Sequence, residues 1–137
     1  MRLLVDTNIF LDIIFNRDNL VKTSSEFFKR SKLVNDELYV SVSTMKDIAY
    51  YLKKNLHDNN LVNRKLLAIY AKIKKVVSTT ADDAITSLYE DGDYEDNIQR
   101  NSANRVMCDG IITRNIKDFA KKDINCWTPD EYLNFRI

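Results

Sequence analysis

The chain has 137 residues, of which 45% are hydrophobic, and its formal net charge is +1. This composition suits one compact domain with its own core, and the near-neutral charge does not by itself mark a nucleic-acid binder. No apolar run is long enough to cross a bilayer, and because the opening apolar residues break at Asp6, we expect no signal peptide.

The cysteines and the histidine exclude several kinds of site. Cys108 and Cys126 form no Cys-x-x-Cys spacing, so we expect neither a zinc site nor a disulfide framework. Reduced thiols are the rule in the cytosol, and we therefore expect a cytoplasmic protein. His57 lies in the polar run 55–60 and is expected on the surface. A Ser/His/Asp triad or a histidine-dependent ribonuclease mechanism is therefore not expected.

Short apolar segments alternate along the chain with segments of helical length. We expect strands at residues 3–5, 38–42, 76–77, 111–113 and 124–127, and helices at residues 8–15, 20–32, 44–56, 60–75, 81–89 and 94–106. This alternation implies right-handed crossovers and a parallel sheet covered by helices on both faces. The predicted fold class is therefore α/β, a three-layer α/β/α domain over residues 1–137 with a central, mostly parallel sheet of four to five strands.

Charge is distributed unevenly. Among the charged residues of segment 53–75, Asp58 is the single acid and all the others are Lys or Arg. Residues 82–96 carry acidic side chains and no Lys or Arg. A protein that grips phosphates in one place and cations in another would show this pattern, but so would two solvated helix faces, which charge alone favours. Tyr50 and Tyr51 precede two lysines and form either an RNA-facing patch or a partly buried pair.

Acidic residues stand directly after predicted strands or at the start of a helix that leads to the next strand, and both places lie at the edge where parallel strands end. Asp6 follows the first strand, Asp47 follows the second after a Ser43–Thr44 helix cap, and Asp118 follows the fourth. The cluster 93–96 opens the helix that leads into that fourth strand. Because ligands of open parallel sheets bind outside the carboxyl ends of the strands, we expect these carboxylates to converge.

Converging carboxylates repel one another unless a cation or a proton neutralises them. Oxygen ligands without thiols or imidazoles suit the hard cations Mg²⁺ and Mn²⁺. Such an ion activates water and stabilises charge on a leaving oxygen, which is the chemistry of phosphodiester hydrolysis.

At this point the residues resemble a known family, the PIN domain, and particularly the stand-alone bacterial PIN ribonucleases that include VapC-like toxins. The resemblance covers nearly the whole chain. It rests on residues 4–8, the Ser41-to-Asp47 strand-to-helix junction, residues 93–96 and residues 111–119, in that order.

The resemblance implies a site, a cofactor and partners. It implies Mg²⁺ or Mn²⁺ as cofactor, single-stranded RNA as substrate, and a small antitoxin protein and a second copy of the chain as partners. Four catalytic metal ligands, four supporting residues and one substrate-binding residue are implied: Asp6, Asp47, Asp96 and Asp118; Thr7, Asn8, Thr113 and Asn115; and Arg114.

Some positions depart from the family pattern or leave alternatives open. Asp47 stands where relatives usually have Glu, and it either binds the metal, directly or through water, or is a plain surface residue. The polar residues after Asp96 replace the small apolar residues that are usual in the family. Asp6 could simply cap a helix, and Asp118 could support the site without binding the metal. Arg114 either contacts phosphate or pairs with a site carboxylate.

The predicted function is a metal-dependent endoribonuclease, more specifically the toxin of a toxin–antitoxin pair. The alternatives are a solitary PIN nuclease of RNA processing and a catalytically inactive PIN-like module that binds RNA or protein. Phosphatase chemistry is less favoured, because an Asp-x-Asp motif after the first strand would be expected and Asn8 stands at its second position.

Overall fold

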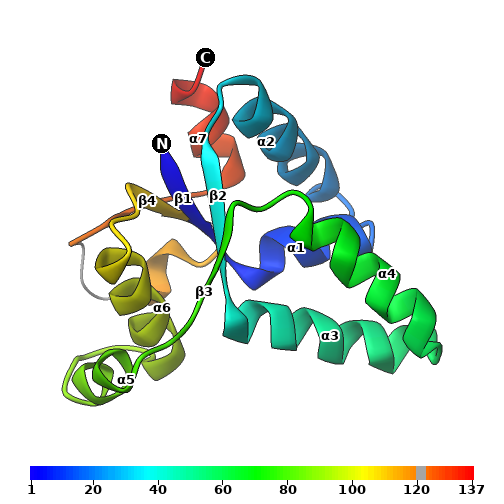
Figure 1. Ribbon diagram of the computed structural model, residues 1–137. Coiled ribbons are helices and arrows are strands. Elements are labelled where there is room, and N and C mark those ends of the chain that lie inside the picture. The colour runs from blue at the N-terminus through cyan, green and yellow to red at the C-terminus, as the bar shows by residue number, and fades with distance from the viewer. Residues whose placement is uncertain (120–122) are drawn as a thin grey trace.

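The computed structural model describes residues 1–119 and 123–137 and shows a sheet with helices on both sides (Figure 1). The strands are β1 (Arg2–Val5), β2 (Glu37–Ser41), β3 (Lys75–Val77), β4 (Gly110–Ile112) and β5 (Asn125–Trp127). The helices are α1 (Thr7–Ile14), α2 (Val21–Leu33), α3 (Val42–Leu56), α4 (Asn59–Tyr70), α5 (Ala81–Leu88), α6 (Tyr94–Arg105) and α7 (Pro129–Phe135), with a 3₁₀ turn η1 (Ile116–Asp118) after β4.

The five strands form one sheet in the order β3-β2-β1-β4-β5, and every neighbouring pair is parallel. In the centre of the sheet, Leu4 pairs with Tyr39 of β2 on one side and with Ile111 of β4 on the other. After β1 the chain forms β2 and β3 on one side of β1, and later β4 and β5 on its other side. The strand order therefore changes direction at β1. Ligands of open α/β sheets bind at such a point.

Alternation along β1 separates two apolar cores. The side chains of Leu3 and Val5 belong to the larger core, whereas Leu4 between them belongs to the smaller one. Helices α1, α2, α3, α4 and α7 supply the larger core, and α6 supplies Ala103 to the smaller one. Helix α5 packs against α6. The predicted α/β class and three-layer arrangement are confirmed.

Hydrogen-bonded caps start the helices that follow the strands and fix where the strands end. The Asp6 carboxylate accepts the N–H of Thr7 at 2.7 Å and begins α1. The Ser41 hydroxyl oxygen accepts the N–H of Thr44 at 3.0 Å and begins α3. An N-cap of this kind is worth about 1 kcal/mol. The side chains that end β1 and β2 are thereby held at one edge of the sheet.

Two predicted boundaries and one missing element need correction. The second strand was expected to run to Val42 with a cap at Ser43–Thr44, but Ser41 is the cap and Val42 already belongs to α3. The helix expected over 60–75 ends at Tyr70, because Lys75 pairs with Tyr39 in the sheet. Helix α7 was not predicted, although Thr128, Pro129 and Glu131 form a capping box with proline in its first turn.

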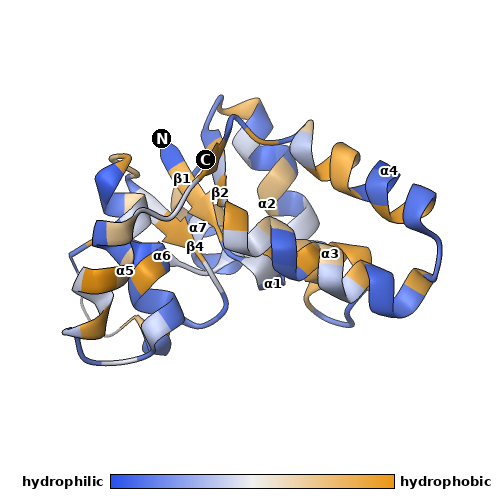
Figure 2. Ribbon diagram, turned by 60° about the horizontal axis from the view of Figure 1, so that its bottom comes forward, coloured by the Kyte–Doolittle hydropathy of each residue, from blue (hydrophilic) through white to orange (hydrophobic). Residues whose placement is uncertain are grey.

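Helix α6 is mostly polar, as its blue colour in Figure 2 shows, and the side chains of its Asn97 and Arg100 are buried among hydrogen bonds and ion pairs. The side chain of Arg100 is 1% exposed and donates to Glu90 at 2.6 Å and to Asp123 at 2.9 Å. The buried amide of Asn97 donates to the carbonyl of Asp91 at 3.0 Å. Polar contacts therefore hold α6, which carries Asp96 in its first turn.

None of the helices in the described ranges combines the length and the apolar character that a bilayer-spanning segment needs.

We predict that Gly110→Ala destabilises the junction of β4 and β5. A Cβ atom at this position would overlap the indole of Trp127 and lie 3.1 Å from the carbonyl oxygen of Asn125. Overpacking of this kind costs about 1–3 kcal/mol, so the melting temperature and the urea midpoint should both fall.

The double variant Gly110→Ala/Trp127→Leu removes the ring that the new methyl group would meet. It should lose less stability than the sum of the two single changes. Full additivity in urea denaturation would contradict the close approach of Gly110 to Trp127.

Candidate active site

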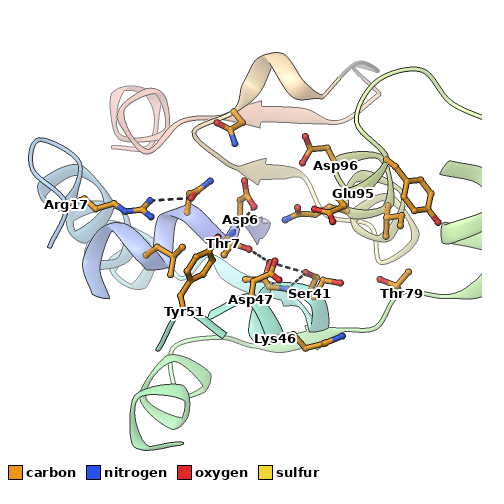
Figure 3. A pocket seen from close by; sticks show the side chains of 18 residues that line it. Asp6, Thr7, Arg17, Ser41, Lys46, Asp47, Tyr51, Thr79, Glu95 and Asp96 are labelled. Carbon is orange, nitrogen blue, oxygen red and sulfur yellow. Dashed lines mark hydrogen bonds between the residues drawn. The ribbon is translucent and has the colours of Figure 1, made fainter. Parts of the chain in front are cut away.

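A cleft of about 550 Å³ lies at the carboxyl edge of the sheet, between the first turns of α1, α3 and α6 (Figure 3). Acidic side chains from all three helix starts line it: Asp6, Asp47, Glu95 and Asp96. Residues that are distant in sequence therefore meet at the edge that the strand pattern indicated.

Asp6 is the most constrained of these carboxylates. It is 8% exposed, one of its oxygens accepts the N–H of Thr7 at 2.7 Å, and the other accepts the hydroxyl of Thr113 at 2.8 Å. The Thr113 hydroxyl oxygen in turn accepts the N–H of Asn115 at 3.0 Å. Because a carboxylate oxygen has two lone pairs, each oxygen of Asp6 retains one for a further partner.

Hydroxyl groups join the start of α1 to the start of α3. The Thr7 hydroxyl donates to that of Thr44 at 3.0 Å, and the Ser41 hydroxyl lies 3.1 Å from the same oxygen (Figure 3). Asp47, one turn into α3, is therefore held in a fixed relation to Asp6. Asn8 also lines the cleft, and its side-chain oxygen accepts a hydrogen bond from Arg17 at 3.3 Å.

The carboxylates of the cleft interact electrostatically, and this interaction adds to the effect of burial on the pKa values of two of them. Asp47 is exposed at the rim, yet desolvation of its carboxyl group raises its pKa; Lys46 opposes this effect, and the charge of Asp6 adds to it. The pKa of Asp96 is raised to about 7, chiefly by burial and then by the charges of Asp93, Asp6, Asp118 and Glu95. The field of Asp6 therefore acts on both Asp47 and Asp96.

Asp118 takes a more distant place than the other three predicted ligands. It is exposed on η1 and is not part of the cleft wall, although its charge contributes to the raised pKa of Asp96. Asp93, which neighbours Asp96, is the N-cap of α6 and accepts the N–H of Asp96 at 3.0 Å. Within the acidic cluster of α6, the side chains of Glu95 and Asp96 line the cleft, whereas Asp93 caps the helix.

The donors fit a hard cation in chemistry. They are carboxylate oxygens, and the pKa of Asp96 is raised first by burial and then by neighbouring negative charge, which a divalent cation would neutralise. Among residues 1–119 and 123–137, however, no three Asp, Glu, His or Cys side chains stand close enough to hold one ion as they are placed. Coordination by Asp6, Asp47 and Asp96 therefore requires their side chains to move together.

Arg114, predicted to contact substrate phosphate or a site carboxylate, lies outside the cleft. Its guanidinium donates to Asp12 at 3.1 Å and to Asp130 at 3.0 Å, and it also donates to the hydroxyl groups of Thr23 and Ser24. The Asp12 side chain is fully buried, so its charge needs a cation beside it. Arg114 therefore pairs with a carboxylate, but with one that does not belong to the predicted set.

Several lining residues were not among the predicted site residues: Arg17, Lys46, Tyr51, Thr79, Tyr94, Glu95 and Gln99. Helical spacing from Asp96 could have indicated Gln99, which lies three residues further along the same helix. Tyr51 is 40% exposed and Tyr50 is 62% exposed, so the pair is not buried. His57 is exposed, as expected.

The thiols take no part in the cleft. Cys108 and Cys126 are free and half-buried, and burial raises the pKa of each to about 11. Thiols with such pKa values carry little negative charge at neutral pH and are poor nucleophiles.

The sequence profile of the PIN domain matches residues 2–117. The chain belongs to the PIN domain family. Its opening strand, three of the predicted ligands (Asp6, Asp47 and Asp96), and Thr113, which follows β4, fall within the matched range, whereas Asp118 lies one residue beyond it.

Three solved structures are similar to this PIN domain. One is VapBC2 from Rickettsia felis bound to a DNA fragment from its promoter, with 16% identity, a TM-score of 0.64, and coverage of 93% of this chain and 98% of that chain. A toxin–antitoxin complex from Klebsiella pneumoniae has 23% identity, a TM-score of 0.66, and coverage of 93% and 97%. VapC20 from Mycobacterium tuberculosis, a Sarcin-Ricin loop cleaving toxin, has 13% identity, a TM-score of 0.58, and coverage of 80% and 86%. No curated protein matches the sequence.

We predict that Arg114→Gln destabilises the PIN domain by about 3 kcal/mol, because it removes the cation beside a buried carboxylate. Arg64→Gln, on the exposed surface of α4, is the matched control and should leave stability within about 0.5 kcal/mol of wild type. Urea denaturation measures both changes. Near-native stability combined with weakened RNA binding would return Arg114 to a phosphate-binding role.

We also predict a pH-dependent effect of Asp96→Asn on stability. The folded protein holds the Asp96 proton with a pKa of about 7, against 3.8 for an ordinary aspartate. The folded state therefore binds more protons than the unfolded state between about pH 4 and 7, and this group makes stability fall as pH rises through that window.

Melting temperatures in EDTA test this prediction between pH 4.5 and pH 8. Asp96→Asn should melt above wild type at pH 8, and the difference should shrink toward pH 4.5. Asp91→Asn, an exposed acid in the same acidic segment, is the control. If the difference in melting temperature between Asp96→Asn and wild type stays constant with pH, the pKa of Asp96 is not raised in the folded protein.

Proposed function

We propose that this PIN domain is a metal-dependent endoribonuclease that cleaves phosphodiester bonds of single-stranded RNA, and that it is the toxin of a toxin–antitoxin pair. One observation carries the proposal. Carboxylates from three separate helix starts share one cleft, and burial, followed by the charges of its acidic neighbours, raises the pKa of Asp96 to about 7. A site that concentrates negative charge in this way suits a divalent cation.

In this proposal Asp6 and Asp96 hold Mg²⁺ or Mn²⁺, and Asp47 and Asp118 contribute directly or through water. The bound ion would supply an activated water and stabilise charge on the leaving oxygen. The protein's own part is orientation, because the N–H of Thr7 and the hydroxyl of Thr113 fix both oxygens of Asp6.

The similar structures support the toxin assignment. Two of them are named as VapBC2 and as a toxin–antitoxin complex, and the third is named as a toxin that cleaves the Sarcin-Ricin loop. We propose by analogy that the partners of this chain are RNA and a small antitoxin protein. We also propose, from the sequence, that it forms a homodimer and acts in the cytoplasm.

A second candidate is an inactive PIN-like module that binds RNA or protein without cutting it. The separation of the acidic side chains within the described residues favours it, since no three of them are in place to coordinate an ion. A third is a solitary PIN nuclease of RNA processing. A short gene directly upstream, whose product co-purifies with the chain and inhibits cleavage, would distinguish a toxin from that third candidate.

Incubation of single-stranded RNA with the protein and Mn²⁺ tests the enzymatic proposal. We expect the wild type to cleave, and Asp6→Asn and Asp96→Asn each to lose at least about a hundredfold in rate, because a ligand matters more than the groups that orient it. EDTA should abolish cleavage, and Asp91→Asn should retain it.

Melting temperatures establish that the two variants remain folded. Calorimetric titration with Mn²⁺ provides a second readout, in which both variants should bind more weakly than wild type. Metal-dependent cleavage that persists in both variants would overturn the site assignment, and a wild type that binds RNA without cutting it would favour the inactive module.

A further inference from the structure

The cleft presents a charge problem for an RNA substrate. Its carboxylates face a ligand that carries a negative charge on every phosphate. One divalent ion does not neutralise both the carboxylates and the phosphates. Among the residues that line the cleft in the described chain, the only cationic side chains are Arg17 and Lys46. Neither belongs to the predicted catalytic set, and both are candidates for contacts with the RNA backbone.

Arg17 reaches the cleft from beyond the end of α1. Its guanidinium returns along the helix and donates to the side-chain oxygen of Asn8 at 3.3 Å, two residues after Asp6 (Figure 3). The same guanidinium nitrogen lies 3.6 Å from a carboxylate oxygen of Asp12, whose side chain is fully buried. Arg17 is thus anchored from behind while its side chain remains 38% exposed.

Lys46 reaches the cleft from the first turns of α3. It is exposed, and it forms no hydrogen bond or ion pair with a residue of the described ranges. Its charge nevertheless acts on the neighbouring Asp47, whose pKa it lowers against the effect of burial. A flexible ammonium group that stands beside a site carboxylate is free to turn toward a phosphate.

The two cations lie on different sides of the carboxylates. In the view of Figure 3, Arg17 lies at the left, beside α1, Lys46 lies at the bottom, below Asp47, and Asp6 and Asp47 are drawn between them. We propose that Arg17 and Lys46 bind the backbone phosphates on the two sides of the scissile phosphodiester, so that single-stranded RNA crosses the cleft from one cation to the other. This inference rests on the proposed function and adds the residues that hold and align the substrate.

Asp12 has a positioning role in this arrangement. Its buried carboxylate is shared by Arg114, at 3.1 Å, and by Arg17. Arg114 is fixed by further bonds to α2 and α7, whereas Arg17 keeps an exposed edge toward the cleft. A guanidinium held in this way loses less conformational freedom when it binds a phosphate than a free side chain would.

Salt dependence of RNA binding tests the proposal. For a single strand, the slope of log K against log salt is about 0.7 per phosphate contact. Anisotropy of a fluorescein-labelled, single-stranded RNA of about ten nucleotides gives this slope, with Mg²⁺ present and every protein carrying Asp6→Asn so that the RNA stays intact. The test variants are Arg17→Gln, Lys46→Gln and their combination.

We expect each single variant to bind on the order of tenfold more weakly at moderate salt, since a charge-assisted hydrogen bond contributes about 1.5 kcal/mol. Each should lower the slope by about 0.7, and the combination should lower it by about twice as much. With Asp6 restored, KM for RNA cleavage should rise while kcat stays near wild type, because the contacts are made outside the reacting bond.

Matched controls separate contact from general charge. Arg64→Gln and Lys65→Gln remove the same charges from the exposed surface of α4, outside the cleft, and should leave the slope unchanged. Arg17→Lys should keep the slope of the wild type. If Arg17→Gln does not fold, as judged by its melting curve, Arg17→Met takes its place, because it keeps most of the apolar stem and removes the charge, and it should lower the slope by the same amount.

An unchanged slope in Lys46→Gln and in folded Arg17→Gln would overturn the inference, as would an equal loss in the α4 controls. These outcomes are distinct from failure of the proposed function. A wild type that never cleaves RNA refutes the nuclease, while the anisotropy slopes still decide whether Arg17 and Lys46 hold the RNA backbone.

Discussion

Repulsion among carboxylates at the end of β1 is the constraint around which the rest of the cleft is organised. Asp6 is nearly buried and keeps its orientation because a backbone N–H and the Thr113 hydroxyl each hold one of its oxygens. Its charge then acts on Asp47 and on Asp96, and the pKa of Asp96 rises to about 7 as a result of burial and of its acidic neighbours. Repulsion between these carboxylates lowers the stability of the folded state unless a partner neutralises them. A divalent cation is a suitable partner for carboxylate oxygens.

Buried polar networks hold the elements that carry the acidic residues. Arg100 lies between Glu90 and Asp123 and fixes α6, while Arg114 and Asp12 tie the end of β4 to α1 and α2. Such networks require every member to be in place, because a lone buried charge is costly. They specify geometry where apolar packing would tolerate sliding. The unusual polar composition of α6 is therefore compatible with a well-placed Asp96.

Topology could be read from the sequence more fully than the site could. Alternating apolar and helical segments gave the α/β class, five strand positions and six of the helices, because burial on both faces leaves a clear apolar signature in each strand. The ends of elements were less well predicted, since Ser41 caps α3 by a hydrogen bond that Ser43 could equally have made on sequence grounds. Helix α7 was missed although its capping box was visible in the residues.

The sequence by itself determined that Asp6 and Asp47 follow strands and that Asp96 begins the helix that leads into β4. These three residues belong to one edge of the sheet, because parallel strands end at the same edge and the helices between them start there. Only the tertiary structure decided which cations face them. Arg17 and Arg114 are both arginines near the ends of elements, yet the buried charge of Asp12 holds Arg114 away from the cleft and leaves Arg17 exposed within it. Side-chain direction depends on partners that are distant along the chain, and no local pattern records them.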